Sequence, residues 1–255
     1  MQWLELLGRH TTFFIEEIGR ITRLFLSTLR LSLIPPVNLR LIIKQMENIG
    51  VNSIPVVLIT AISTGMVLAL QSYNGFRRFN AESLVGTVVA LSMTRELGPV
   101  LTGLIVAGRA GAAMAAELGT MKVTEQIDAL STMAVNPVKY LVVPRVISSM
   151  IMMPVLTVFA NLVGIVGGYF IAVQILDVNP TVYVRRTTDF LELDDIYGGI
   201  LKALVFGLII ASISCYKGFA TEGGAEGVGR ATTGAVVISS MLILISDYFL
   251  TAILF

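Results

Sequence analysis

The sequence predicts an all-α membrane protein with an amino-terminal interfacial helix followed by five transmembrane helices. Hydrophobic residues make up 55% of the chain, charged residues only 14%, and the mean hydropathy is +0.83. Soluble domains usually carry about 25% charged residues. Five apolar segments are long enough to cross a hydrocarbon core of about 30 Å. The net charge of +1 gives no information about partners, but no basic block suggests nucleic acid. With one histidine (His10) and one cysteine (Cys215) we expect neither a metal site nor an internal disulfide.

Residues 1–52 are expected to form an amphipathic elbow region at the membrane surface. Within residues 13–34, one side is apolar and the other carries the charges, a pattern typical of a helix lying in the interface. The apolar side consists of Phe14, Ile18, Ile21, Phe25 and Leu29. Pro35-Pro36 should end this helix, and a weaker amphipathic piece at about 37–51 leads to a cap at Asn52-Ser53, with Pro55 in the first turn of a span.

Residues 53–255 form the predicted five-span domain, with apolar segments at about 54–72, 84–116, 146–176, 197–216 and 233–254. At 1.5 Å per residue the second segment would reach about 50 Å, so it must tilt, bend or protrude. Gly98-Pro99 is the expected bend, because Pro99 has no N–H to donate to the carbonyl of Arg95.

The distribution of basic residues predicts the orientation of the chain. The first residues, MQWLELLGRH, do not resemble a cleavable signal peptide, so we expect a cytoplasmic amino end. The outer loops then hold only Arg77, Arg78, Arg185 and Arg186, and residues 177–196 are the main outer segment. The cytoplasmic segments hold Arg9, Arg20, Arg23, Arg30, Arg40, Lys44, Lys122, Lys139, Arg145, Lys217 and Arg230.

Arg95 and Glu96 lie in the middle of the second apolar segment, where ionisable residues are costly. Neighbours on a helix point about 100° apart, so each needs a partner of its own. Lys202, Asp247 and Arg109 are the candidates, although Lys202 and Asp247 could instead lie at the outer interface. Two interpretations remain open: structural ion pairs, or a polar pocket for a ligand with a charged head and an apolar body.

A polar segment at 117–139 separates the second and third spans. Val123, Ile127 and Leu130 form an apolar stripe at helical spacing, which predicts a helix at about 117–136 that Asn136-Pro137 ends. Its charged residues are Glu117, Lys122, Glu125 and Asp128. A solvated loop could look like this, but a helix between two spans is suited to docking on a soluble partner.

No catalytic motif is apparent, so we expect a transport subunit and not an enzyme. The cluster at 223–230 imitates a phosphate-binding loop only from Gly224 onward, with Arg230 in place of lysine and Ala231 in place of Ser or Thr. We interpret it as a cytoplasmic turn and expect no cofactor in this chain.

The run VALSMTRELGPVLTGLIVAGRAGAAMAAELGTMKVTEQIDAL, with MAVNP and VPR after it, closely resembles the MlaE-type permeases of ABC transporters that work with MCE proteins. The resemblance extends through GMVLALQ (Gly65–Gln71) and NAESLVG (Asn80–Gly86) to GRATT and the terminal DYFLTAILF, and covers about residues 40–255.

The resemblance implies a homodimeric permease in the inner membrane of a Gram-negative bacterium. A cytoplasmic ATPase dimer would bind ATP and magnesium, an MCE protein would sit at the outer face, and the cargo would be phospholipid, contributing to outer-membrane lipid asymmetry. A small accessory cytoplasmic protein is a further partner that the resemblance allows.

The resemblance also implies site residues. Glu117 to Ala134 would form the helix that couples to the ATPase, with Glu117, Val123, Glu125, Ile127, Asp128 and Leu130 as its main residues. The lipid pathway would include Leu68, Phe76, Phe79, Arg95, Glu96, Lys202 and Asp247. Phe79 stands where better-known members carry tyrosine, which removes a hydroxyl from that position.

Two other functions compete with this interpretation. One is a non-transporting scaffold that anchors an MCE complex, in which Arg95 and Glu96 would be purely structural. The other is an intramembrane lipid-modifying enzyme, which the single histidine outside the spans disfavours.

Overall fold

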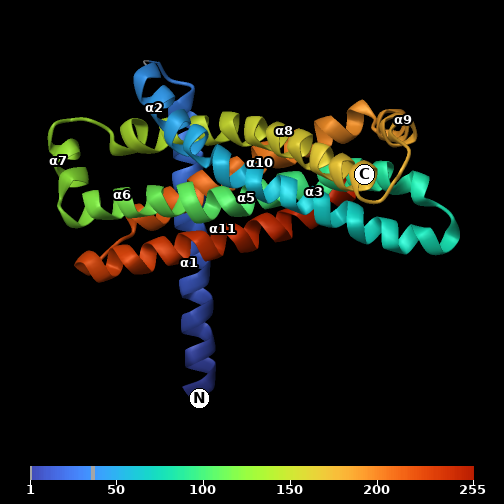
Figure 1. The fold of residues 1–255 in the computed structure, drawn as a ribbon. Helices are drawn as coiled ribbons and strands as arrows, with labels where there is room; N and C mark the ends of the chain where they lie inside the picture. Colours follow the sequence, from blue (N-terminus) through green and yellow to red (C-terminus); the bar gives the residue numbers. More distant parts are fainter. Residues whose placement is uncertain (1, 36–37) are drawn as a thin grey trace.

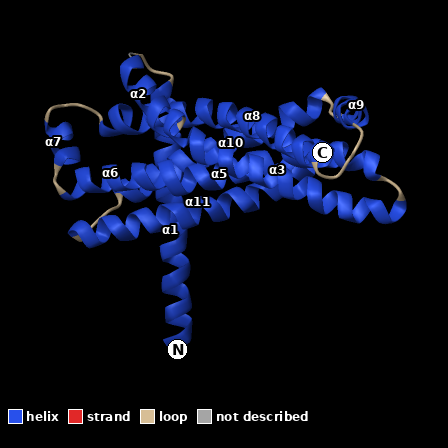
Figure 2. Ribbon diagram, in the orientation of Figure 1, coloured by secondary structure: helices blue, strands red, loops and turns tan. Residues whose placement is uncertain are grey.

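A computed structural model describes residues 2–35 and 38–255, and this part of the chain is built of helices and connecting loops (Figures 1 and 2). The side chains of residues 1–11, 13 and 14 are outside the described part, and so are the sequence predictions for His10, Phe14 and Pro36. The helices that precede the second span are α1 (Gln2–Ser32), α2 (Leu39–Ile49), the short η1 (Val51–Ser53), α3 (Ile54–Phe76) and η2 (Arg77–Phe79).

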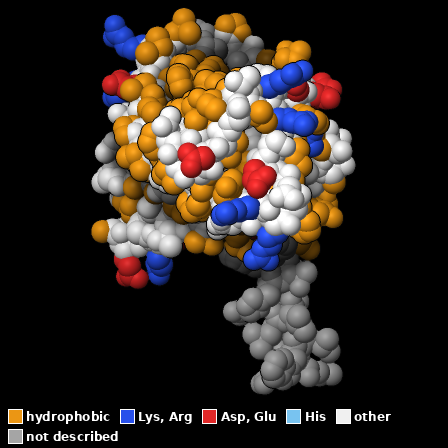
Figure 3. Space-filling model, turned by 45° about the vertical axis from the view of Figure 1, so that its right-hand side comes forward, with side chains coloured by type: hydrophobic (Ala, Val, Ile, Leu, Met, Phe, Trp, Pro, Cys, Tyr) orange, Lys and Arg blue, Asp and Glu red, His pale blue; other side chains and the backbone are white. Residues whose placement is uncertain are grey.

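Five helical stretches are long and apolar enough to cross a membrane, which confirms the predicted fold class. They run over Leu39–Phe79, Glu82–Val123, Val138–Gln174, Leu193–Phe219 and Gly224–Leu254. Each is longer than the apolar segment seen in the sequence, because the helical hydrogen bonding continues into polar residues beyond the apolar run. Figure 3 shows apolar side chains over much of the surface, as a lipid-facing protein requires.

The second stretch is one helix of 42 residues that contains two π turns. It consists of η3 (Glu82–Leu84), α4 (Val85–Ser92), η4 (Met93–Leu97), α5 (Gly98–Val106), η5 (Ala107–Gly111) and α6 (Ala112–Val123), with the π turns at η4 and η5. The expected interruption at Gly98-Pro99 is therefore a π turn directly before Pro99, in which the N–H of Gly98 reaches the carbonyl of Met93. A wide turn of this kind accommodates a residue that cannot complete the helical ladder.

The remaining helices complete the bundle around three apolar clusters. They are η6 (Val138–Val142), α8 (Val143–Gln174), α9 (Pro180–Phe190), α10 (Leu193–Phe219) and α11 (Gly224–Leu254). α3 packs most extensively on α8. Their backbones touch at Gly65, where a Cβ atom would lie 1.9 Å from the carbonyl oxygen of Gly164. Small residues thus allow the close helix approach that membrane bundles use.

The amino-terminal helix α1 crosses the bundle instead of running along it (Figure 1). It contacts α8, α10 and η6 with a face that includes Leu24 and the buried Thr28. Ile18 and Leu29, which the sequence placed on the same apolar side as Ile21, are exposed. Ile21 and Phe25 of that side are half-buried, so the predicted apolar side packs on the protein only in part. Its exposed residues suit an interfacial helix, whose membrane placement stays a prediction.

The predicted side-chain cap at Asn52-Ser53 is not present at the start of α3. Ser53 precedes α3 and Pro55 lies in its first turn, but no side chain caps the helix. The Ser53 hydroxyl instead donates to the carbonyl of Ile49 at 2.6 Å and accepts a hydrogen bond from Arg109. The side chain therefore joins α2 to the second span.

Residues 177–196, predicted to be the main outer segment, contain a helix, α9, that the sequence did not predict. Asn179 caps it by accepting hydrogen bonds from the N–H groups of Thr181 and Val182, and Pro180 occupies its first turn. Tyr183 packs into the bundle edge-on to Tyr169, and burial raises the pKa of its hydroxyl. This side chain fixes α9 across the end of the bundle opposite α7 (Figure 1).

The predicted helix at 117–136 is two helices. α6 ends at Val123, and α7 (Gln126–Thr132) begins after Glu125, which adopts a left-handed conformation with φ of 60°. An ion pair between Lys122 and Asp128, 3.1 Å long, spans the break. The stripe of Val123, Ile127 and Leu130 is consequently divided by a turn, which spacing alone could not reveal.

Candidate functional site: a buried lysine between two carboxylates

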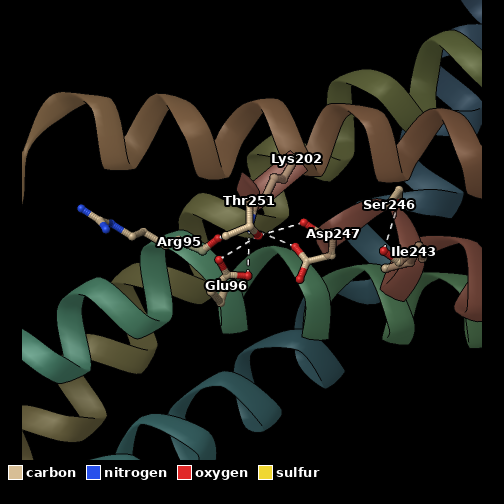
Figure 4. A network of polar contacts seen from close by, with 7 residues as sticks. All are labelled: Arg95, Glu96, Lys202, Ile243, Ser246, Asp247 and Thr251. Atoms are coloured by element: carbon tan, nitrogen blue, oxygen red, sulfur yellow. Dashed lines mark hydrogen bonds and ion pairs between the residues drawn. The ribbon is translucent and has the colours of Figure 1, made fainter. Parts of the chain in front are cut away.

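Lys202 on α10 is fully buried, with 0% of its side chain exposed, and it faces η4 and α11 (Figure 4). Its ammonium Nζ lies 2.9 Å from Glu96 Oε2 and 3.0 Å from Asp247 Oδ1. It also donates hydrogen bonds to the carbonyl of Arg95 at 2.9 Å and to Thr251 Oγ1 at 2.7 Å. We call Glu96, Lys202, Asp247 and Thr251 the Lys202 cluster.

The surroundings of Lys202 explain how a charge is kept inside a membrane span. A buried ion is tolerated only when its desolvation is offset by close partners. Four oxygens surround the three ammonium donors, and two of them belong to carboxylates. One lysine faces two carboxyl side chains, Glu96 and Asp247, so the cluster holds one more acidic group than basic ones.

The π turn η4 exposes the carbonyl of Arg95 to which Lys202 donates. Because Pro99 has no N–H, the carbonyl of Arg95 loses its usual helical donor, and Lys202 supplies a hydrogen bond in its place. Gly199, one turn before Lys202, allows α10 to come this close, since a Cβ atom there would lie 2.2 Å from the carbonyl oxygen of Thr94. Pro99, which favours the π turn, therefore also leaves free the carbonyl to which Lys202 donates.

Arg95 points away from the cluster (Figure 4). Its guanidinium pairs with Asp195 in the first turn of α10 at 2.6 Å, and the ring of Phe255 lies 4.7 Å from its Cζ. Asp195 is buried and also accepts a hydrogen bond from the N–H of Glu192, as part of a capping box. Arg95 and Glu96 therefore have separate partners, as their angular separation on the helix required.

The cluster is accessible on its acidic side. The side chains of Glu96 and Asp247 are 37% and 18% exposed, whereas Lys202 is enclosed. On α11, Leu244 and Tyr248 are exposed apolar side chains within about 100° of Asp247 around the helix axis. A molecule at this surface would meet carboxylate oxygens next to an apolar wall.

The other predicted pathway residues lie in a different part of the bundle. Leu68 and Phe76 on α3 pack against the apolar cluster that contains Val85 and Tyr183, and Phe79 in η2 is 80% exposed. Of the seven residues assigned to the pathway, Glu96, Lys202 and Asp247 meet directly, and Arg95 touches them through its carbonyl. Arg109, a candidate partner for the charges, binds the carbonyl of Asn48 and the hydroxyl of Ser53 instead.

The predicted coupling residues divide into buried and exposed groups. Ile127 is buried in an apolar cluster that Leu130 also contacts, so this part of the stripe packs inward. Glu125 and Asp128 are exposed at the tip, and Val123 is half-buried. Glu117 forms an ion pair of 2.7 Å with the buried Arg145, whose guanidinium also donates to the carbonyl of Leu141.

Three residues of this region were missed by sequence reasoning. Asp195 was assigned to an outer loop, although Glu192 and Asp195 before an apolar run form a capping-box pattern that places them at a helix start. Thr251 lies four residues after Asp247, on the same helix face. Phe255 carried no signal, since its contact with Arg95 depends on how α10 and α11 pack.

Comparisons with known proteins agree with this architecture. Residues 42–253 match the family model described as Permease MlaE. A probable ABC transporter permease protein of Rickettsia typhi is 52% identical over 250 residues, covering 98% of this chain and 96% of the relative. The intermembrane phospholipid transport system permease protein MlaE of Haemophilus influenzae is 36% identical over 260 residues, covering 100% of this chain and 98% of the relative. The chloroplastic protein TRIGALACTOSYLDIACYLGLYCEROL 1 of Arabidopsis thaliana is 39% identical over 213 residues, covering 84% of this chain and 61% of the relative.

A match over most of the chain, together with the five apolar helices, shows that the chain is a multi-pass membrane protein that belongs to the MlaE permease family.

Proposed function

We propose that this chain is the permease subunit of an ABC transporter that moves phospholipids between the inner membrane and an MCE protein at the outer face. In a Gram-negative cell this transport would contribute to the lipid asymmetry of the outer membrane. The observation that carries the proposal is the Lys202 cluster, a group of ionisable side chains with half-buried carboxylates inside otherwise apolar spans. The names of the relatives, ABC transporter permease and phospholipid transport permease, support it.

The chemistry of the cluster suits a lipid. A diacyl lipid needs an apolar wall for its chains and a few polar groups to orient its head. The exposed apolar residues of α11 offer the wall, and Glu96 and Asp247 offer the polar groups. A homodimer would enclose this surface between two copies, with Leu68, Phe76 and Phe79 contributing from α3 and η2.

The energy would come from a cytoplasmic ATPase dimer that binds ATP and magnesium. It would dock at the tip formed by the end of α6 and by α7, where Glu125 and Asp128 are exposed. The end of α6 and Glu96 belong to one continuous helix, Glu82–Val123, so a displacement of the tip can reach Glu96 along this helix. We infer that closure of the ATPase dimer opens or compresses the lipid site through this helix, with the amino end of the chain in the cytoplasm.

A transport assay on Glu96→Gln tests the lipid role. The substitution keeps the shape of the side chain and removes its charge. Losing one charged hydrogen bond to the lipid or to Lys202 should slow lipid transfer by about tenfold or more in proteoliposomes containing the ATPase and the MCE protein. Glu226→Gln, an exposed carboxylate of α11, is the matched control and should transport normally. Unchanged transfer by Glu96→Gln in an intact complex would remove Glu96 from the lipid path, and an intact wild-type complex that transfers no lipid would favour the scaffold.

Docking is tested separately with Glu125→Asn, because asparagine tolerates the left-handed conformation and the turn is kept. We expect weaker retention of the ATPase on affinity-purified permease, with unchanged thermal stability of the permease. Glu82→Gln, at the opposite end of the same helix, should retain the ATPase fully. Equal retention by both variants would remove Glu125 from the docking surface.

A further inference from the structure

A polar cavity lies between α2 and α6, on the side of the bundle that carries α7 (Figure 1). Its volume is about 380 Å³, within the range of small-ligand sites. The polar groups that line it are the guanidinium of Arg109, the carboxylate of Glu117 and the side-chain amides of Gln45, Asn48 and Asn52. Ala110, Ala113 and Met114 supply much of the apolar lining.

Arg109 is held in place with donors to spare. Its Nη1 donates to the carbonyl of Asn48 and to Ser53 Oγ, both at 3.0 Å. Both bonds use one nitrogen, and Nη2 has no hydrogen-bond partner within residues 2–35 and 38–255. A fixed guanidinium with free N–H groups is the arrangement that recognises phosphate by two parallel hydrogen bonds.

Gln45 is a second polar group that lines the cavity. Only 9% of this residue is exposed, it lines the cavity, and its amide has no hydrogen-bond partner among the residues that the structure describes. The amide atoms of Gln45 are not among the fully enclosed unpaired atoms of the described residues, so they are reachable from the cavity and can bond to a polar ligand there. Gln45 lies between Ile42 and Ile49 on the buried face of α2, which directs it inward.

The charges around the cavity favour an anion. Glu117 is already paired with Arg145 at 2.7 Å, which leaves Arg109 as the uncompensated charge. The Lys202 cluster shows the opposite balance, with one carboxylate in excess. Glu96 and Arg109 lie thirteen residues apart on the same helix, about 20 Å at 1.5 Å per residue, so the two sites are distinct.

The setting of α2 indicates where the anion comes from. Leu39 and Ile43 on this amphipathic helix are exposed apolar side chains, as expected of a helix at the boundary between hydrocarbon and water. Lipid phosphates lie at that level. We propose that the cavity between α2 and α6 binds the phosphate of a membrane phospholipid, held by Arg109 and Gln45 at the α7 side of the bundle. This site requires only that the chain spans a bilayer, and it would stand even if the Lys202 cluster does not carry lipid.

The test is a lipid titration of the purified full-length protein in detergent, followed by native mass spectrometry. Dioleoylphosphatidylglycerol is the probe, and dioleoylglycerol, with the same chains but no phosphate, is the reference. Gln45→Leu removes the amide at similar volume and should weaken phosphatidylglycerol binding at one site by about tenfold, while Arg109→Gln should weaken it at least as much. Because Arg109 also bonds to Asn48 and Ser53, the Gln45 variant keeps the test valid if Arg109→Gln folds poorly.

Two control variants distinguish binding in this cavity from general charge attraction and from binding at the Lys202 cluster. Lys44→Gln, an exposed charge on the same helix, should bind like the wild type, and an equal loss there would overturn the proposal in favour of general attraction. Glu96→Gln should leave this site intact, so that failure of the lipid path and failure of the cavity are told apart. Equal binding of dioleoylglycerol, or complete displacement by glycerol 3-phosphate in solution, would overturn the assignment to a lipid phosphate.

Discussion

The Lys202 cluster and the tip of the α6–α7 turn both contain a lysine paired with a carboxylate, in opposite surroundings. Lys202 is enclosed and contacts Glu96, Asp247, Thr251 and the carbonyl of Arg95. Lys122 meets Asp128 at 3.1 Å, and 60% of that carboxylate side chain is exposed to solvent. At the cluster water cannot replace a lost partner, whereas at the tip it can. Burial, and not the ion pair itself, therefore decides how much each lysine contributes to stability.

The largest effect should follow from Lys202→Met. The substitution leaves Glu96 and Asp247 facing each other without a counter-ion, and breaking a buried pair costs about 3–5 kcal/mol. We expect a lower unfolding temperature in detergent and a smaller monodisperse fraction.

The charge argument is sharpened by the triple variant Lys202→Met, Glu96→Gln, Asp247→Asn. Neutralising both carboxylates should recover much of the lost stability, because the unpaired charges are removed. If the triple variant is as unstable as the single one, packing around Lys202, and not charge, is what matters there.

Arg145→Met removes a buried charge whose ion-pair partner is exposed. The guanidinium is buried, but its partner Glu117 is 55% exposed and can be hydrated once the pair is lost. Losing the bonds to Glu117 and to the carbonyl of Leu141 should cost about 1.5–3 kcal/mol, less than Lys202→Met. Thermal unfolding of both variants in one detergent compares them, and a loss equal to that of Lys202→Met would contradict the role given to solvent.

Ala134→Gly should stabilise the protein slightly. Ala134 adopts a left-handed conformation with φ of 58°, which costs an alanine about 1–2 kcal/mol. Glycine removes that strain but adds about 0.4–1 kcal/mol of unfolded-state entropy, so a small net gain in unfolding temperature is expected. A loss of stability would show that the methyl group makes a contact that outweighs the strain.

Lys122→Ala should have the smallest effect, within about 1 kcal/mol, because exposed ion pairs contribute little. Raising the salt concentration should reduce even this difference in unfolding temperature. A cost as large as that of Arg145→Met would mean that the pair is needed to close the α6–α7 turn.

The candidate site was recognised in sequence because charges inside apolar segments require partners. Glu96, Lys202 and Asp247 could be named on that ground alone, and the structure brings them together. The partner of Arg95 could not be named, since Asp195 seemed to belong to an outer loop and is one hundred positions away. The coupling stripe was misjudged for a related reason: helical spacing identifies an apolar face but not the turn at Glu125 that redirects it.

The number of spans and the helical fold class followed from the sequence, because a bilayer of known thickness demands long apolar helices with satisfied backbones. That Glu96, Lys202 and Asp247 need partners, and that Pro99 interrupts the regular helix, followed in the same way. Which ions pair, which face of α1 packs, and where cavities remain depended on the folded chain. Those features arise from contacts between residues far apart in sequence, such as Gly199 against Thr94 and Gly65 against Gly164, and no local pattern encodes such contacts.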